Sequence, residues 1–179
     1  MKTSVLRQFG LVLGATVIMA NNLIAQSDEF LALQHVKNPI PDYRENSSGN
    51  NTLTDPVVSS KTLSIFAAMF KGASDARWYE IDNKFMVKFD RDGRQTTALF
   101  KKNGAHIYTI SYGFEKHLPA DIRRLVKINY FDFEITNAIE VNTLGKTAWI
   151  VKLDDQHSMV TVKVVDDEME EVENYRKSK

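Results

Sequence analysis

Three turn signals at nearly equal intervals constrain the fold of this chain more than any other feature of its sequence. Asp82-Asn83, Asp92-Gly93 and Asn103-Gly104 each separate segments that are rich in aromatic and β-branched residues. Such pairs favour two-residue hairpin turns, because both central positions of that turn need a positive φ. The sequence therefore predicts four antiparallel strands, near residues 76–81, 84–91, 94–102 and 105–113.

A helix is expected immediately before these strands. Apolar residues recur at helical spacing from Lys61 onward, and Gly72 follows as a residue that ends helices. The apolar stripe of this helix consists of Leu63, Phe66, Ala67 and Phe70.

The same order then recurs in the second half of the chain. Leu118-Pro119 opens a second helix, because a proline early in a helix loses no hydrogen bond. Four more strands are expected near residues 133–142, 146–154, 157–165 and 169–175.

The fold class that follows is α+β, with two tandem units that each contain one helix and four antiparallel strands. The helices should pack on one face of the sheet. Phe85–Asp90 (FMVKFD) resembles Trp149–Asp154 (WIVKLD), which favours a repeat with units at 61–117 and 118–179. The alternative is a single α+β domain in which this likeness is accidental. Whether the eight strands form one continuous sheet or two is left open by the sequence.

Two-residue turns also fix which residues lie opposite each other in the first four strands. One face should then receive the helix around Phe66 and Phe70, because it carries most of the bulky side chains. Its two cross-strand rows are Trp78, Val87, Ala98, Thr109 and Glu80, Phe85, Phe100, Ile107.

The opposite face gives a candidate contact surface. Its central row of Tyr79, Met86, Leu99 and Tyr108 is apolar, and a flanking row contains Arg77 and Lys88 together with Thr97 and Ile110. Contiguous apolar surface with a polar border is typical of partner-binding sites. The alternative is that the second unit, or the chain before residue 60, covers this row. The candidate partner-binding residues are Tyr79, Met86, Leu99, Tyr108, Lys88 and Arg77.

The first twenty-five residues have the three parts of a secretory signal peptide. Lys2 and Arg7 precede an apolar run from Phe9 to Ala20, and a small residue, Ala25, precedes the expected cleavage site. The alternative is a retained membrane anchor, but the run is shorter than the ~20 residues that a spanning helix needs. The sequence predicts cleavage after Ala25, a periplasmic or secreted location, and no stable membrane insertion afterwards.

Residues 26–60 are expected to form a polar linker or arm. This stretch is rich in Asn, Ser, Pro and Asp, and such segments bury too little apolar surface to offset the entropy of ordering. The exception is an apolar island, Phe30-Leu31-Leu33 with Val36, for which the alternative is a short helix that docks. Whether residues 26–60 are ordered is therefore left open.

Composition and motifs exclude several classes of function. The chain has no cysteine, so disulfides, thiolate metal sites and cysteine catalysis are excluded. Removal of the predicted signal leaves 21 of the 23 basic residues against 23 acidic ones, which gives no reason to expect nucleic acid as a partner. No catalytic or cofactor-binding motif is found, and the histidines are scattered singly. We expect no metal, no cofactor and no enzymatic activity.

Several segments resemble a known family. FKGASDARW (70–78), TTALFKKNGAHIYT (96–109) and VTVKVVDDEMEEVENYR (160–176) resemble the PepSY-like or β-lactamase-inhibitor-like tandem-repeat periplasmic proteins that are common in Bacteroidetes. The likeness covers roughly residues 61–176. The chain departs from the family pattern at Lys71, at Asp167-Glu168 and at Tyr130–Phe133, where the family has Pro, Asp-Gly and Tyr-Pro-Gly-Tyr respectively. These departures concern local turns.

The resemblance implies an exported binding module, in some relatives one that inhibits or regulates an enzyme, and it implies no catalytic residues. Together with the candidate face, it predicts a non-enzymatic protein that engages another protein or a peptide through one face of its sheet. The alternative is a structural envelope protein that self-associates through the same face. The sequence does not identify the partner.

Overall fold

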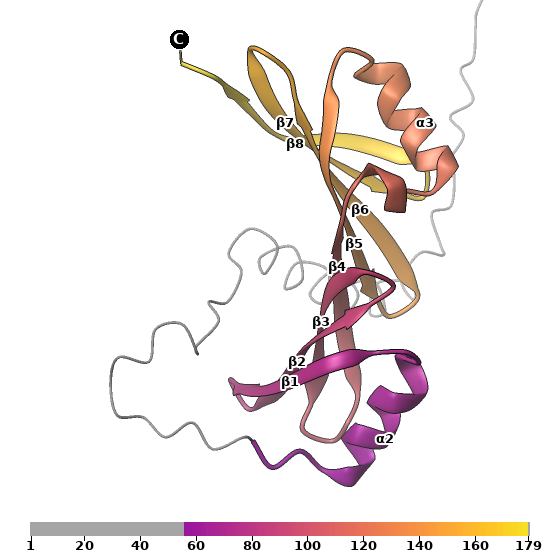
Figure 1. The fold of residues 1–179 in the computed structure, drawn as a ribbon, viewed down its shortest axis with the longest axis vertical. Helices are drawn as coiled ribbons and strands as arrows, with labels where there is room; N and C mark the ends of the chain where they lie inside the picture. Colours follow the sequence, from indigo (N-terminus) through magenta and orange to yellow (C-terminus); the bar gives the residue numbers. More distant parts are fainter. Residues whose placement is uncertain (1–55, 179) are drawn as a thin grey trace, which may run out of the picture.

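The protein is described by a computed structural model that covers residues 56–178 (Figure 1). The predicted signal peptide, its cleavage after Ala25 and nearly all of the predicted arm lie outside the described residues. In chain order the elements are α2 (Ser60–Met69), β1 (Ser74–Ile81), β2 (Lys84–Arg91), β3 (Arg94–Lys101), β4 (His106–Gly113), the 3-10 turn η1 (Glu115–His117), α3 (Ala120–Asn129), β5 (Glu134–Thr143), β6 (Lys146–Asp154), β7 (Ser158–Val165) and β8 (Glu168–Arg176).

All eight strands belong to one antiparallel sheet, in the order β1-β2-β3-β4-β5-β6-β7-β8. β4 and β5 pair continuously from Tyr108↔Thr143 to Gly113↔Ala138. The predicted fold of two tandem helix-plus-four-strand units is therefore wrong: the described residues form a single eight-stranded sheet with two helices. The physical reason is that two separate sheets would leave β4 and β5 as edges with unpaired backbone groups, whereas their pairing satisfies both.

The first helix packs through an aromatic cluster. α2 begins after Ser59, whose side chain accepts a hydrogen bond from the Thr62 N–H at 3.2 Å. Phe66 and Phe70, at the end of the helix, contact the rings of Trp78, Phe89 and Phe100 on the sheet. Leu63, which the helical spacing placed in the buried stripe, is exposed instead.

The second helix packs on the same face of the sheet. α3 begins after Pro119, which occupies the cap position just outside the helix. Ile122 and Val126 are buried against Trp149 and Val151 of β6. The strand register from β2 to β6 places this contact on the same side as α2, and Figure 1 shows the two helices on the same side of the sheet, one toward each end. The opposite side receives neither helix.

Two of the three turn predictions are confirmed. Asp82-Asn83 and Asp92-Gly93 have positive φ at both positions, between 47° and 68°, and they join strands that pair directly on either side. The last hairpin uses the same conformation at Asp166-Asp167, with φ values of 49° and 64°. Aspartate tolerates this region better than most residues, so the missing glycine does not alter the hairpin.

The third turn differs from its prediction. Lys101 donates to the Ala105 carbonyl at 2.8 Å, so three residues form the loop, and of these only Gly104 has a positive φ (88°). This is the geometry of a three-residue hairpin followed by a bulge. Phe100 consequently pairs with His106 rather than with Ile107, but the register shift that follows restores the predicted pair of Leu99 and Tyr108.

Gly104 and Gly93 form a matched pair for a stability test. Both have a positive φ, but a Cβ on Gly104 would lie 3.0 Å from Ile65 Cδ1 of α2, whereas a Cβ on Gly93 would meet nothing within 4 Å. We expect Gly93→Ala to lower the free energy of unfolding by about 1 kcal/mol and Gly104→Ala to lower it by roughly twice as much. Urea unfolding followed by circular dichroism measures both values. Equal losses would show that α2 does not pack tightly on this loop.

Candidate partner-binding face

The side of the sheet opposite α2 and α3, here called the helix-free face, carries a continuous apolar cluster. Neither helix contributes a residue to it. Thirteen residues from β1 to β7 form the cluster: Met86, Leu99, Ile107, Tyr108, Ile110, Ile139, Val141, Ala148 and Ile150 are buried, and Tyr79, Ile81, Tyr112 and Val165 are partly buried against them.

The predicted central row lies on this face in the predicted register. Met86 pairs with both Tyr79 and Leu99, and Leu99 pairs with Tyr108. The flanking row is also in register, with the pairs Arg77↔Lys88, Lys88↔Thr97 and Thr97↔Ile110.

The six candidate residues differ in their accessibility. Met86, Leu99 and Tyr108 are buried, with exposed fractions of 0%, 7% and 3%. Tyr79 and Lys88 are half-buried, and Arg77 is exposed. Lys88 places its ammonium group 5.7 Å from the centre of the Tyr79 ring, which is a favourable cation–π arrangement. Only the β1 side of the row is therefore directly accessible to a partner.

The apolar cluster continues well beyond the predicted row. Ile110 pairs with Val141, which pairs with Ala148, and a second row runs through Ile139 and Ile150. The sequence did not reveal this half of the surface, because it left open whether the last four strands join the same sheet.

Two tyrosines report the low polarity of this face. Burial, followed by the nearby Tyr112 group, raises the pKa of Tyr108 to about 12. Burial also raises the pKa of Tyr112. Both shifts arise because a tyrosinate loses its hydration in an apolar environment.

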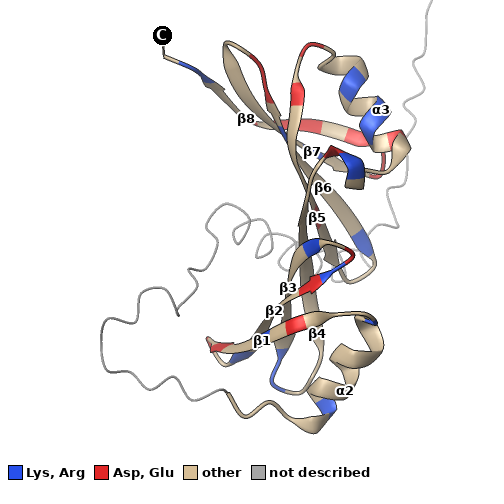
Figure 2. Cartoon of the chain, in the orientation of Figure 1, with Lys and Arg blue, Asp and Glu red and all other residues tan. Residues whose placement is uncertain are grey.

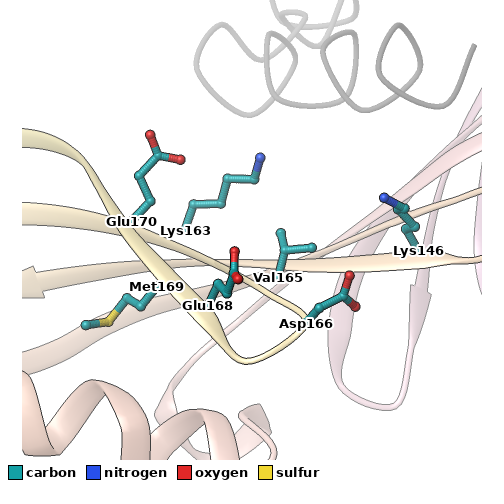
Figure 3. A pocket seen from close by; sticks show the side chains of 7 residues that line it. All are labelled: Lys146, Lys163, Val165, Asp166, Glu168, Met169 and Glu170. Atoms are coloured by element: carbon teal, nitrogen blue, oxygen red, sulfur yellow. The ribbon is translucent and has the colours of Figure 1, made fainter. Parts of the chain in front are cut away.

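A depression of about 560 Å³ lies where β6, β7 and β8 meet. Its β8 wall is acidic, and Figure 2 shows acidic residues along this strand. Figure 3 shows Lys163 and Val165 pointing to one side of the strands and Met169 to the other. Val165 belongs to the helix-free cluster, so the depression adjoins that face. Its lining residues are Lys146, Lys163, Val165, Asp166, Glu168, Met169 and Glu170.

A polar network on the helix-covered side was not predicted. The Arg94 guanidinium donates to Glu140 at 2.6 Å, Asn142 donates to the same carboxylate at 2.9 Å, and Thr147 donates to Asn142 at 2.7 Å. These groups satisfy one another and tie β3, β5 and β6 together between the two helices. Glu140, a charged residue between Ile139 and Val141, was the one sequence signal for it.

Neither a metal-binding cluster nor a membrane-spanning helix occurs among the described residues. Within residues 56–178, no group of three or more His, Asp or Glu side chains could hold a metal ion. No helix in the same range is long and apolar enough to cross a membrane. His106 is hydrogen-bonded to Thr109 at 2.8 Å, and His117 accepts a hydrogen bond from the Phe114 N–H at 3.0 Å.

Comparison with known proteins finds similarity among solved structures. No protein-family model matches the chain, and no curated protein matches it. A BLIP-like protein from Bacteroides fragilis aligns with a TM-score of 0.54 at 12% identity, over 66% of this chain and 85% of the other. A DUF2874 family protein from Bacteroides ovatus aligns with a TM-score of 0.53 at 13% identity, over 68% and 89%. A third structure, from Bacteroides eggerthii and provisionally described as a periplasmic protein, gives 0.52 at 11%, over 68% and 90%.

At these identities the similarity establishes the fold alone. The fold of the chain is therefore similar to that of the BLIP-like and DUF2874 structures. The β-lactamase-inhibitor-like part of the sequence resemblance is confirmed at the level of fold, and its PepSY-like part stays a prediction.

The burial of Tyr108 gives a pH-dependent prediction. Because its pKa is about 12 in the folded protein and near 10 in the unfolded chain, it contributes stability that is fully present below pH 10 and is lost as the pH rises through 12. We expect Tyr108→Phe to remove this part of the alkaline loss of stability. The urea midpoint of both proteins, measured from pH 9 to pH 12, checks this. Parallel curves would mean that Tyr108 ionises as readily in the folded protein as in the unfolded chain.

Proposed function

We propose that this chain is an exported, non-enzymatic binding module that engages a protein or peptide through the helix-free face. The observation that carries the proposal is the apolar cluster that spans the helix-free face from β1 to β7. The partly exposed members of this cluster border the buried ones, and contiguous apolar surface with a polar border is typical of partner-binding sites. These partly exposed members are Tyr79, Ile81, Tyr112 and Val165.

Export is supported by the sequence of residues 1–25, which has the charged start, short apolar centre and small-residue end of a signal peptide. The provisional description of the similar Bacteroides eggerthii structure as periplasmic agrees with this location. The BLIP-like fold is shared with proteins that have little sequence identity to this chain, so it leaves the target undetermined.

The chemistry of the face favours an amphipathic partner segment. The apolar row would bury aliphatic or aromatic side chains, and Lys88 and Arg77 at its β1 end would attract acidic groups. Tyr79 is half-buried at the same end and offers an aromatic ring with a polar hydroxyl, a combination that is frequent at interfaces. We therefore place the first contact at the β1 end of the face.

Self-association through the same face is the second candidate function. It would need two copies of the face to meet, whereas the β8 edge carries Glu168, Glu170, Glu171 and Glu173, which repel a second copy at that edge. Light scattering of the mature protein over a range of concentrations distinguishes the two candidates. A molar mass that rises from one chain to two would favour self-association.

A photo-crosslinking amino acid in place of Tyr79 tests the proposed function in intact envelopes. We expect it to form a defined adduct with an envelope protein, and we expect Lys88→Glu with Arg77→Glu to weaken that adduct about tenfold because two attractive charges are reversed. The matched control is Arg123→Glu with Arg124→Glu, which reverses two exposed charges on α3. Equal yields from the two double variants, or no adduct at all, would contradict the proposal.

A further inference from the structure

The two edge strands of the sheet differ in charge. β1 and β8 stand at the ends of the strand order, so among residues 56–178 each has a strand neighbour on one side only. β8 carries four glutamates, and charge on an edge strand opposes the addition of another strand. The regular part of β1 carries one cation, Arg77, and one carboxylate, Glu80, which is paired with Lys102 at 2.5 Å. β1 is therefore the edge that can accept a further strand.

A bulge sets the usable length of this edge. The pairing of β1 with β2 shifts by one residue between Ser74 and Arg77, and Asp75 within this interval has a φ of 53°. A bulge of this kind bends the strand and interrupts its pairing. From Arg77 to Ile81 the two strands pair residue by residue, so five regular residues are offered to a partner.

The turn at Asp82-Asn83 determines which backbone groups of β1 face outward. In a two-residue hairpin the residues that flank the turn exchange two hydrogen bonds, and bonded and non-bonded pairs then alternate along the strands. The residues of β1 that bond to β2 in this way are Ile81, Tyr79 and Arg77. The N–H and C=O groups of Trp78 and Glu80 consequently point away from β2, toward the outer edge.

The side chains of the same five residues favour apolar neighbours at three positions. Arg77, Tyr79 and Ile81 lie on the helix-free side, and the last two belong to its apolar cluster. On the helix-covered side, the Trp78 ring contacts the Phe66 ring of α2, with 5.3 Å between their centres. A strand beside β1 would bury more of each apolar side chain by placing another opposite it.

Charge favours an acidic residue at one further position. Arg77 pairs with Lys88, so two cationic side chains are neighbours on the helix-free side of this edge. A carboxylate opposite Arg77 would be attracted by both. Glu80 is already paired with Lys102, so an uncharged polar residue suits the position opposite it.

We propose that the partner of this chain adds an extended, antiparallel segment to β1 and so extends the sheet by a ninth strand. From its N-terminus the segment has the pattern apolar, polar, apolar, apolar, acidic. These positions lie opposite Ile81, Glu80, Tyr79, Trp78 and Arg77 in turn. Its backbone exchanges hydrogen bonds with Trp78 and Glu80, and its side chains supply the specificity. This inference rests on the proposed function, because it gives the chemistry of the partner that the helix-free face would engage.

A fluorescent synthetic peptide with the central sequence Ile-Thr-Val-Val-Glu tests strand addition on the mature full-length chain. N-methylation of its second valine, opposite Trp78, removes a donor that faces β1. N-methylation of its first valine, opposite Tyr79, removes a donor that faces away. We expect saturable binding by fluorescence anisotropy, weakened at least about tenfold by the first methyl group and less than about twofold by the second. Equal effects, or no binding of the unmethylated peptide, would overturn the proposal.

Glu80→Pro and Glu80→Ala form a matched pair on the protein side. Both remove the ion pair with Lys102, but only proline also removes an N–H that faces the outer edge, and neither removes a bond to β2. We expect Glu80→Pro to weaken peptide binding at least about tenfold relative to Glu80→Ala. Equal affinities would contradict strand addition. If Glu80→Pro does not fold, as judged by circular dichroism, the methylated peptides decide the question.

A charge exchange tests the register. Arg77→Glu should weaken binding of the peptide about tenfold, and a peptide with lysine in place of its glutamate should bind Arg77→Glu more tightly than it binds the natural chain. Weaker binding by Arg77→Glu without this recovery would overturn the proposed position of the acidic residue.

Hydrogen exchange in the free protein detects any other occupant of the edge. We expect the amides of Trp78 and Glu80 to exchange at least about tenfold faster than those of Tyr79 and Ile81, and to become protected when the peptide binds. Protection without peptide would overturn the proposal. A molar mass of two chains by light scattering would then show that a second copy occupies the edge, and a mass of one chain would show that another part of the same chain does.

The crosslink at Tyr79 separates this inference from the proposed function. The envelope adduct should fall at least about tenfold in Glu80→Pro relative to Glu80→Ala. If the adduct is equal in both variants, the proposed function stands and strand addition by the partner is overturned. If the peptide binds as expected but no envelope adduct forms in the natural chain, β1 accepts a strand and the proposed function fails.

Discussion

The backbone pairing of β4 with β5 is the interaction on which the rest of the structure depends. It joins two groups of four strands into one sheet, places both helices on the same side, and makes the opposite side continuous from β1 to β7. Without it, Ile110 would lose Val141 as its neighbour, and the apolar cluster would divide into two smaller patches. The candidate site is thus a property of the whole sheet rather than of any one hairpin.

Much of the local structure could be predicted because it depends on near neighbours. The turn at Asp92-Gly93 needs two residues that tolerate positive φ, and the sequence contains them. Once that turn is set, the pairing of Met86 with Leu99 follows by counting residues. The exception is the hairpin at Gly104, because a glycine preceded by Asn103 suits a two-residue or a three-residue loop, and the structure has the three-residue form.

Long-range features could not be predicted in the same way. The twenty residues between β4 and β5, which include α3, suggested a boundary between two units. The two strands are nevertheless neighbours in the sheet. Arg94 and Glu140 form their ion pair across that same interval. The candidate row was found by register, but its burial was not, because burial depends on what lies over the face rather than on the order of residues within it.

The central claim is that the paired strands gather an apolar cluster on the helix-free face whose inner side chains are buried in the free protein. The rate of methionine oxidation by peroxide tests this on the unmodified chain, since sulfur atoms react only when the oxidant reaches them. Met86 is 0% exposed on the helix-free face, whereas Met69 and Met159 are 44% and 48% exposed elsewhere. Mass spectrometry should find Met69 and Met159 oxidised while Met86 remains reduced. Oxidation of Met86 at the same rate would show that the face is open and would contradict the account.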